Sequence, residues 1–175
     1  LSEERPHTTA AFLAFLAEKA IACEQLYILG DFFDAWIGDD DDRPLAAEIA
    51  NALRKISDHG VQVFFQHGNR DFLLGDTYAA RCGMQLLPEL YVIEHACRRY
   101  LLAHGDQFCT QDAAYQQFRE LVRNPEWQRD FLAKPLTERR AIAAQLRAKS
   151  KEANSIKAED IMDVTPSEIE TALVA

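Results

Sequence analysis

Three short apolar runs in the first part of the chain each end abruptly in polar side chains. The runs, with the residues that follow them, are 26–29 with Gly30-Asp31, 61–65 with Gly68-Asn69, and 100–103 with His104. Short runs rich in branched and aromatic side chains predict buried strands. Because ligands gather at the carboxyl ends of such strands, we expect Asp31, Asn69 and His104 to form one polar site at one edge of a sheet.

Between these runs the apolar residues recur at helical spacing. Helices are expected at residues 8–21, 44–59 and 77–82, and two strands joined by a polar turn at 91–93 and 99–103. Pro44 suits the first position of a helix, and Gly60 and Gly83 suit helix ends. The alternation of strands and helices predicts an α/β layered fold, with a largely parallel sheet flanked by helices.

The strand pattern stops near residue 113, and the rest of the chain is expected to be helical. The predicted helices are 113–122, 125–133 and 135–152. Residues 119–157 contain ten Lys or Arg and five Asp or Glu, whereas the whole chain has a net charge of -9. We therefore interpret residues 113–157 as a basic helical lid, inserted into a single domain that covers residues 1–175.

Composition narrows the class of protein. A chain of 175 residues suits one domain, and the net charge of -9 argues against a general nucleic-acid binder. The four cysteines are scattered without a Cys-x-x-Cys pair, which is typical of a reducing compartment. The first residues lack the pattern of a signal peptide, and no run of about 18 apolar residues is present. We expect a cytoplasmic location.

The side chains at the three strand ends are metal ligands by type. A carboxylate, an amide oxygen and an imidazole together suit Mn²⁺, Fe²⁺ or Zn²⁺ better than Ca²⁺. For one such residue alone a turn or a cap would be the favoured interpretation, but the same placement three times favours a metal site. Other candidates are set aside: residues 39–42 are expected to be a solvated acidic loop, His59 and His67 to make local hydrogen bonds, and His7 and His95 to bind no metal.

Several motifs resemble those of a known family. They are Gly30-Asp31-Phe32-Phe33-Asp34, Gly68-Asn69-Arg70-Asp71 and His104-Gly105-Asp106. These motifs resemble the calcineurin-like metallophosphoesterases, which use a two-metal site to hydrolyse phosphate esters or anhydrides. Most members have His where this chain has Arg70, and Arg is typical of one branch, the UDP-2,3-diacylglucosamine hydrolases of lipid A synthesis. Residues 104–112, 150–157 and 161–164 are also similar to that branch.

The resemblance implies roles for individual residues. Asp31 would bridge two Mn²⁺ ions, Asn69 and His104 would complete the protein ligands of one of them, and Asp34 would orient a neighbouring group. The implied substrate contacts are Asn69, Arg70, Asp112, Ser150, Asn154 and Lys157. From spacing alone, an ordinary solvated helix face would be the favoured interpretation of Ser150, Asn154 and Lys157, and the resemblance reverses that preference.

The implied reaction is hydrolysis of the pyrophosphate of a UDP-linked diacylated sugar to UMP and the acylated sugar 1-phosphate. Trp127, Phe131 and Leu132 would either contact acyl chains or pack between helices. The basic helices would favour an anionic membrane surface, on the inner face of the bacterial inner membrane. No protein partner is indicated.

The family also has motifs that this chain does not contain. Its first motif, Asp-x-His, would precede Leu1, and its last, Gly-His-x-His, would follow Ala175. We therefore expect the chain to be an internal part of a longer protein, and to bind metal poorly and show little activity by itself. Two alternatives stay open: another calcineurin-like phosphoesterase, acting on nucleotides or phosphoproteins, and a non-catalytic binding module of the same fold. Arg70 and the set at positions 150, 154 and 157 favour the hydrolase branch.

Overall fold

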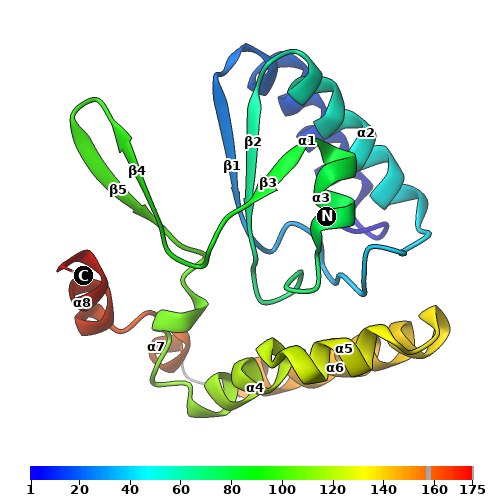
Figure 1. Ribbon diagram of the computed structural model, residues 1–175. Coiled ribbons are helices and arrows are strands. Elements are labelled where there is room, and N and C mark those ends of the chain that lie inside the picture. Colours follow the sequence, from blue (N-terminus) through cyan, green and yellow to red (C-terminus); the bar gives the residue numbers. More distant parts are fainter. Residues whose placement is uncertain (157–158, 175) are drawn as a thin grey trace. The chain divides into compact units, whose positions relative to one another are not determined.

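The computed structural model describes residues 1–156 and 159–174, which group into two compact units, Leu1–Ala103 and His104–Ala175 (Figure 1). The elements of the first unit are α1 (Pro6–Glu18), the 3₁₀ helix η1 (Ala20–Ala22), β1 (Gln25–Leu29), α2 (Pro44–Asp58), β2 (Gln62–Gln66), α3 (Asp76–Cys82), β3 (Met84–Leu86), β4 (Tyr91–His95) and β5 (Arg98–Leu102). Those of the second unit are the 3₁₀ helix η2 (Asp106–Phe108), α4 (Ala113–Arg123), α5 (Pro125–Leu132), α6 (Leu136–Ile156), α7 (Glu159–Met162) and α8 (Pro166–Val174). The predicted α/β class is confirmed.

A parallel sheet forms the centre of the first unit. Its strands lie in the order β1-β2-β3, and Leu29 at the end of β1 pairs with Gln66 at the end of β2. Parallel neighbours point the same way, so the loops that follow β1 and β2 leave the sheet at the same edge. The expected meeting of the first two strand ends is confirmed.

The sequence pattern does not predict β3. This strand has only three residues, too few to show a period, and it pairs with β2 from Val63↔Met84 to Phe65↔Leu86. Gly83 precedes it in the left-handed conformation (φ 71) and ends α3. The predicted helix end at Gly83 is therefore confirmed, and the turn there returns the chain to the sheet.

The third apolar run does not join the parallel sheet, so that part of the expectation is wrong. β5 pairs with β4 in a separate antiparallel hairpin, from Tyr91↔Leu102 to His95↔Arg98. Ala96 and Cys97 both have positive φ, 50 and 62, and form a two-residue turn. Such a turn joins antiparallel neighbours, whereas a parallel pair needs a long crossover.

The helices of the first unit lie close to the residue ranges predicted from the sequence. α2 begins at Pro44 as expected, and its apolar face buries Ile49, Ala50 and Leu53 completely. α2 packs against α1, α3, β2 and β3 (Figure 1). α1 is shorter than expected: it ends at Glu18, and the chain tightens into the 3₁₀ turn of η1 before β1.

The second unit is helical in its described residues. α4, α5 and α6 confirm the three helices expected from residue 113 onward, whereas α7 and α8 are additional. Within α5, Trp127 stacks on Phe131 with ring centroids 5.1 Å apart, and Phe131 is buried while Leu132 is exposed. Packing therefore accounts for Phe131, and the role of residues 113–157 as a lid stays a prediction. None of the helices in the described ranges combines the length and apolar composition needed to span a bilayer.

Candidate active site at the ends of two parallel strands

The loop after β1 begins in an unusual backbone conformation. Gly30 and Asp31 both lie in the left-handed region, with φ of 80 and 50. Glycine adopts this region freely, but an aspartate there is uncommon and points to a functional constraint. The next two residues, Phe32 and Phe33, are buried and pack edge to face with ring centroids 4.8 Å apart. The loop is thus anchored in the core directly beside Asp31.

The loop after β2 passes extremely close to that of β1, and Gly68 makes the approach possible. A Cβ atom at Gly68 would lie 2.2 Å from the Asp31 backbone nitrogen and 2.6 Å from its Oδ1. No side chain larger than hydrogen fits there without moving one loop away from the other. The glycine of this motif is therefore required by a close approach of two backbones.

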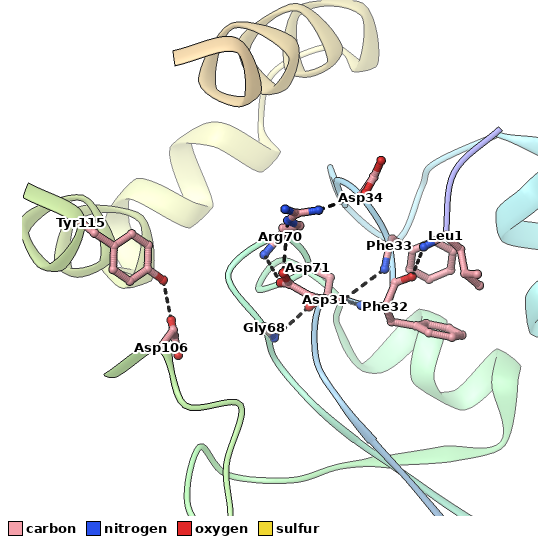
Figure 2. A network of polar contacts seen from close by, with 10 residues as sticks. All are labelled: Leu1, Asp31, Phe32, Phe33, Asp34, Gly68, Arg70, Asp71, Asp106 and Tyr115. Atoms are coloured by element: carbon pink, nitrogen blue, oxygen red, sulfur yellow. Dashed lines mark hydrogen bonds and ion pairs between the residues drawn. The ribbon is translucent and has the colours of Figure 1, made fainter. Parts of the chain in front are cut away.

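Asp71 ties the two loops together (Figure 2). This carboxylate is completely buried. Its Oδ1 accepts a hydrogen bond from the Gly68 N–H at 2.8 Å, and its Oδ2 accepts from the Phe32 and Phe33 N–H groups at 2.6 and 3.3 Å. Three backbone donors offset the cost of burying the charge.

Arg70 lies between two carboxylates of the β1 loop, as Figure 2 shows. Its Nε is 3.1 Å from Asp31 Oδ2, and its Nη1 is 3.1 Å from Asp34 Oδ1. The backbone N–H of Arg70 also donates to Asp31 Oδ1 at 3.1 Å. Asp34 thus contacts the Arg70 side chain, and the orienting role expected for it stays a prediction. The three side chains are 27–36% exposed, so solvent reaches this cluster.

Asp31 and Asn69 are the candidate metal ligands of the first unit. A carboxylate and an amide oxygen suit a hard divalent cation, and Asn69 is half-buried between Gly68 and Arg70. Within the described residues, no three or more His, Cys, Asp or Glu side chains are grouped so that they could hold a metal ion. The donor set therefore fits part of a cation's ligand shell in type, but not a whole one.

His104 follows β5 and begins the second unit, where it is half-buried. Its approach to Asp31 and Asn69 stays a prediction. Two residues later, buried Asp106 accepts a hydrogen bond from the Tyr115 hydroxyl at 2.6 Å (Figure 2). It also accepts one from Arg119 Nε at 3.0 Å. α4 thereby holds the turn that follows His104.

Opposing effects set the ionisation of Asp106, and burial also affects its partner Tyr115. Burial alone would raise the pKa of Asp106, but the hydrogen bond from Tyr115 and the charge of Arg119 outweigh it and lower the pKa below its ordinary value. Burial, together with the hydrogen bond to Asp106, raises the pKa of Tyr115. The carboxylate therefore stays ionised and the phenol stays protonated at neutral pH.

Three of the expected substrate residues of the second unit lie at the start of α4 or within α6. Asp112 is buried and caps α4, since its Oδ1 accepts from the Tyr115 N–H at 3.0 Å. Ser150 is exposed, and it and Asn154 lie four residues apart in α6. Lys157 lies outside the described residues. Substrate contact by all four stays a prediction.

Two carboxylates of the acidic loop are structural, so the expectation of a solvated loop is wrong for them. The side chain of Asp41 is fully buried and pairs with Arg43, whose Nε is 2.6 Å from Oδ2. The backbone N–H groups that donate to Asp39 are those of Gly75 at 2.8 Å and Tyr78 at 2.9 Å. The start of α3 offers unpaired N–H groups, and a carboxylate from a distant loop satisfies them.

The expected local hydrogen bonds of two histidines are confirmed. His59 Nδ1 lies 2.7 Å from the Lys55 carbonyl oxygen at the end of α2. His67 Nε2 lies 2.7 Å from the Leu74 carbonyl oxygen. Each ring nitrogen faces an acceptor, so it carries the proton as the donor.

Sequence reasoning missed the roles of Asp71 and Asp106. Both stand inside the quoted motifs, next to Arg70 and two residues after His104. An acidic residue in a motif suggests a ligand or a surface charge equally well. Only burial and the identity of the hydrogen-bond donors show that these two carboxylates bind parts of the protein itself.

Comparison with known proteins gives a consistent result. The chain is 55% identical over 169 residues to a UDP-2,3-diacylglucosamine hydrolase of Cellvibrio japonicus, covering 97% of this chain and 70% of the relative. Proteins of the same name from Serratia proteamaculans and Escherichia coli O81 are 52% and 53% identical, over 99% of this chain and 72% of each relative. No family model matches the chain.

Proposed function

Because the chain belongs to the UDP-2,3-diacylglucosamine hydrolases, we propose that it hydrolyses the pyrophosphate bond of UDP-2,3-diacylglucosamine. Water adds across the P–O–P bond, and the products are UMP and 2,3-diacylglucosamine 1-phosphate, an intermediate of lipid A synthesis. The observation that carries this proposal is identity above 50% to proteins of that name over nearly the whole chain. The conformation of Asp31 and its contact with Arg70 support a site at the ends of β1 and β2.

Asp31, Asn69 and His104 are the residues proposed to hold Mn²⁺. A pair of such cations, when bound, supplies positive charge that activates a water molecule and balances the phosphoryl oxygens. Asp31 is suited to bridging because its two carboxylate oxygens can serve different partners.

Arg70 is proposed to bind and orient the phosphate groups. A guanidinium carries five N–H groups in a rigid fork, so its contacts with Asp31 and Asp34 leave capacity for phosphate oxygens. The two carboxylates hold the fork at the ends of the strands. Lysine could not reproduce this, since its single ammonium lacks the planar geometry.

The second unit is proposed to bind the sugar and the acyl chains. Asp112, Ser150, Asn154 and Lys157 carry the polar contacts that the family resemblance implies, and Trp127 and Leu132 are candidate acyl-chain contacts. The excess of Lys and Arg in residues 119–157 favours an anionic membrane surface. Binding to vesicles with anionic lipid should therefore weaken as salt rises, and absence of binding at low salt would argue against membrane association.

The test is a hydrolysis assay of the full-length protein on UDP-2,3-diacylglucosamine, with and without Mn²⁺. We expect UMP release that depends on Mn²⁺ and is lost in Asp31→Asn, whereas Asp58→Asn serves as an exposed control on α2. Hydrolysis of simple phosphodiesters or nucleotides in preference to the UDP-sugar would favour a different phosphoesterase. Binding of the UDP-sugar without turnover would favour a non-catalytic module.

A further inference from the structure

The two strand-end loops are bonded to each other reciprocally. Asp31 of the first loop accepts the backbone N–H of Arg70 in the second. Asp71 of the second loop accepts the backbone N–H groups of Phe32 and Phe33 in the first. Each loop therefore presents one carboxylate to the backbone of the other. The two aspartates differ in their surroundings, since Asp31 is partly exposed and Asp71 is completely buried.

Burial rules out direct chemistry for Asp71. Its side chain has no exposed surface, and both oxygens receive hydrogen bonds from backbone N–H groups at 2.6–3.3 Å. A carboxylate in this position cannot reach a ligand at the solvent-exposed edge. Two of its three donors instead belong to residues that adjoin the candidate ligands: Phe32 follows Asp31, and Gly68 precedes Asn69.

We propose that Asp71 is the positioning residue of this site, which holds Asp31 in its left-handed conformation and keeps Asn69 beside it. The φ of Asp31 is 50, and the bonds to the Phe32 and Phe33 N–H groups fix the backbone directly after it. The bond to the Gly68 N–H fixes the backbone directly before Asn69. Without Asp71, the strained aspartate relaxes and the two ligands separate. The inference rests on the proposed function, because it assigns Asp31 and Asn69 to the metals.

The chain offers a matched control for this role. Asp39 also accepts three hydrogen bonds from N–H donors of the first unit, namely Gly75 N, Tyr78 N and Trp36 Nε1. It caps α3 and makes none of its hydrogen bonds to the two strand-end loops at residues 30–34 and 67–71. Asp71→Asn and Asp39→Asn therefore remove similar bonds from the same unit, but only the first disturbs the backbone beside Asp31 and Asn69.

The experiment compares Asp71→Asn, Asp39→Asn and Asp31→Asn in the full-length protein. Mn²⁺ affinity is measured by titration calorimetry, thermal unfolding by circular dichroism, and kcat and KM on the UDP-sugar. We expect Asp71→Asn to lower Mn²⁺ affinity or kcat by about 10- to 100-fold with KM little changed. Asp39→Asn should lower the unfolding temperature similarly but leave Mn²⁺ affinity and kcat within about twofold.

Equal losses of Mn²⁺ affinity in Asp71→Asn and Asp39→Asn would overturn the proposal, because they would show a general effect of stability. Unchanged affinity and kcat in Asp71→Asn, with both lost in Asp31→Asn, would overturn the positioning role alone. If Asp31→Asn binds Mn²⁺ and turns over normally, the metal assignment itself fails, and the inference with it.

A measurement on the unmodified protein keeps the proposal testable if Asp71→Asn does not fold. Coupling between two groups is reciprocal, so Mn²⁺ binding at Asp31 should stabilise the bonds to Asp71. Hydrogen exchange of the Phe32, Phe33 and Gly68 amides should slow on adding Mn²⁺ by more than that of Gly75 and Tyr78, which bond to Asp39. Equal slowing at both sets of amides would contradict the proposal.

Discussion

Replacing Gly68 by alanine tests whether the close approach of the two loops is real. The added Cβ would lie 2.2 Å from the Asp31 nitrogen, so the loops must separate by roughly 1.2 Å to restore the 3.4 Å of ordinary contact. Forcing one carbon into such a contact costs about 1–3 kcal/mol. The movement also weakens the bonds Gly68 N–Asp71 and Arg70 N–Asp31, at about 1 kcal/mol each. A loss of about 3–5 kcal/mol in the free energy of unfolding is expected.

Gly60→Ala is the matched control. Unlike Gly68, Gly60 has a positive φ, 100, but a Cβ there would meet nothing within 4 Å. Its replacement carries only the backbone strain of a left-handed residue, about 1–2 kcal/mol. Urea unfolding of the purified variants measures both losses, and the unfolding temperature of Gly68→Ala should fall by about 6–20 °C. The reasoning is refuted if Gly68→Ala is no less stable than Gly60→Ala.

Three further predictions concern other parts of the chain. Tyr115→Phe removes a hydrogen bond to a buried charge and should lower the free energy of unfolding by about 1.5–3 kcal/mol in urea titrations. The pKa of Asp106 is lower in the folded protein than its ordinary value of 3.8, so the ionised carboxylate stabilises the fold fully at neutral pH. This stabilisation is lost as the pH falls below 3.8. If Tyr115→Phe lowers the free energy of unfolding equally at pH 3 and pH 7, the prediction is contradicted. Burial raises the pKa of Cys82 to about 12, so iodoacetamide at pH 7.5 should alkylate exposed Cys97 and leave Cys82 unmodified by mass spectrometry. Lys157→Ala should raise KM or lower kcat on the UDP-sugar in the full-length protein, and unchanged kinetics would remove this residue from the binding site.

Local signals predicted most of the elements. Pro44 and Gly83 mark a helix start and a helix end by their own backbone preferences, and the structure places both there. β3 was not predicted because three residues are too few to show a hydrophobic period. The third apolar run was assigned to the wrong sheet because strand character is local, whereas the choice of partner depends on the turn at Ala96 and Cys97.

The residues of the candidate site also fall into those that the sequence predicts and those that it does not. Asp31, Asn69 and Arg70 could be proposed from residue type and placement after a strand. The function of their neighbours could not, since Asp71 and Asp39 have the same chemistry as any loop aspartate until their donors are known. Asp39 was expected in solvent and instead caps a helix that begins 37 residues later.

The amino-acid sequence by itself determined where strands and helices lie, because hydrophobic period, proline and glycine act on residues close together in the chain. It also determined the family, through motifs that lie at strand ends. The tertiary structure alone decided that Asp31 meets Arg70, and that Asp71 meets Phe32 and Phe33, across separations of 38 or 39 residues. The reason is that a hydrogen bond between distant loops exists only once strand pairing has brought the donor and acceptor atoms within about 3 Å of each other.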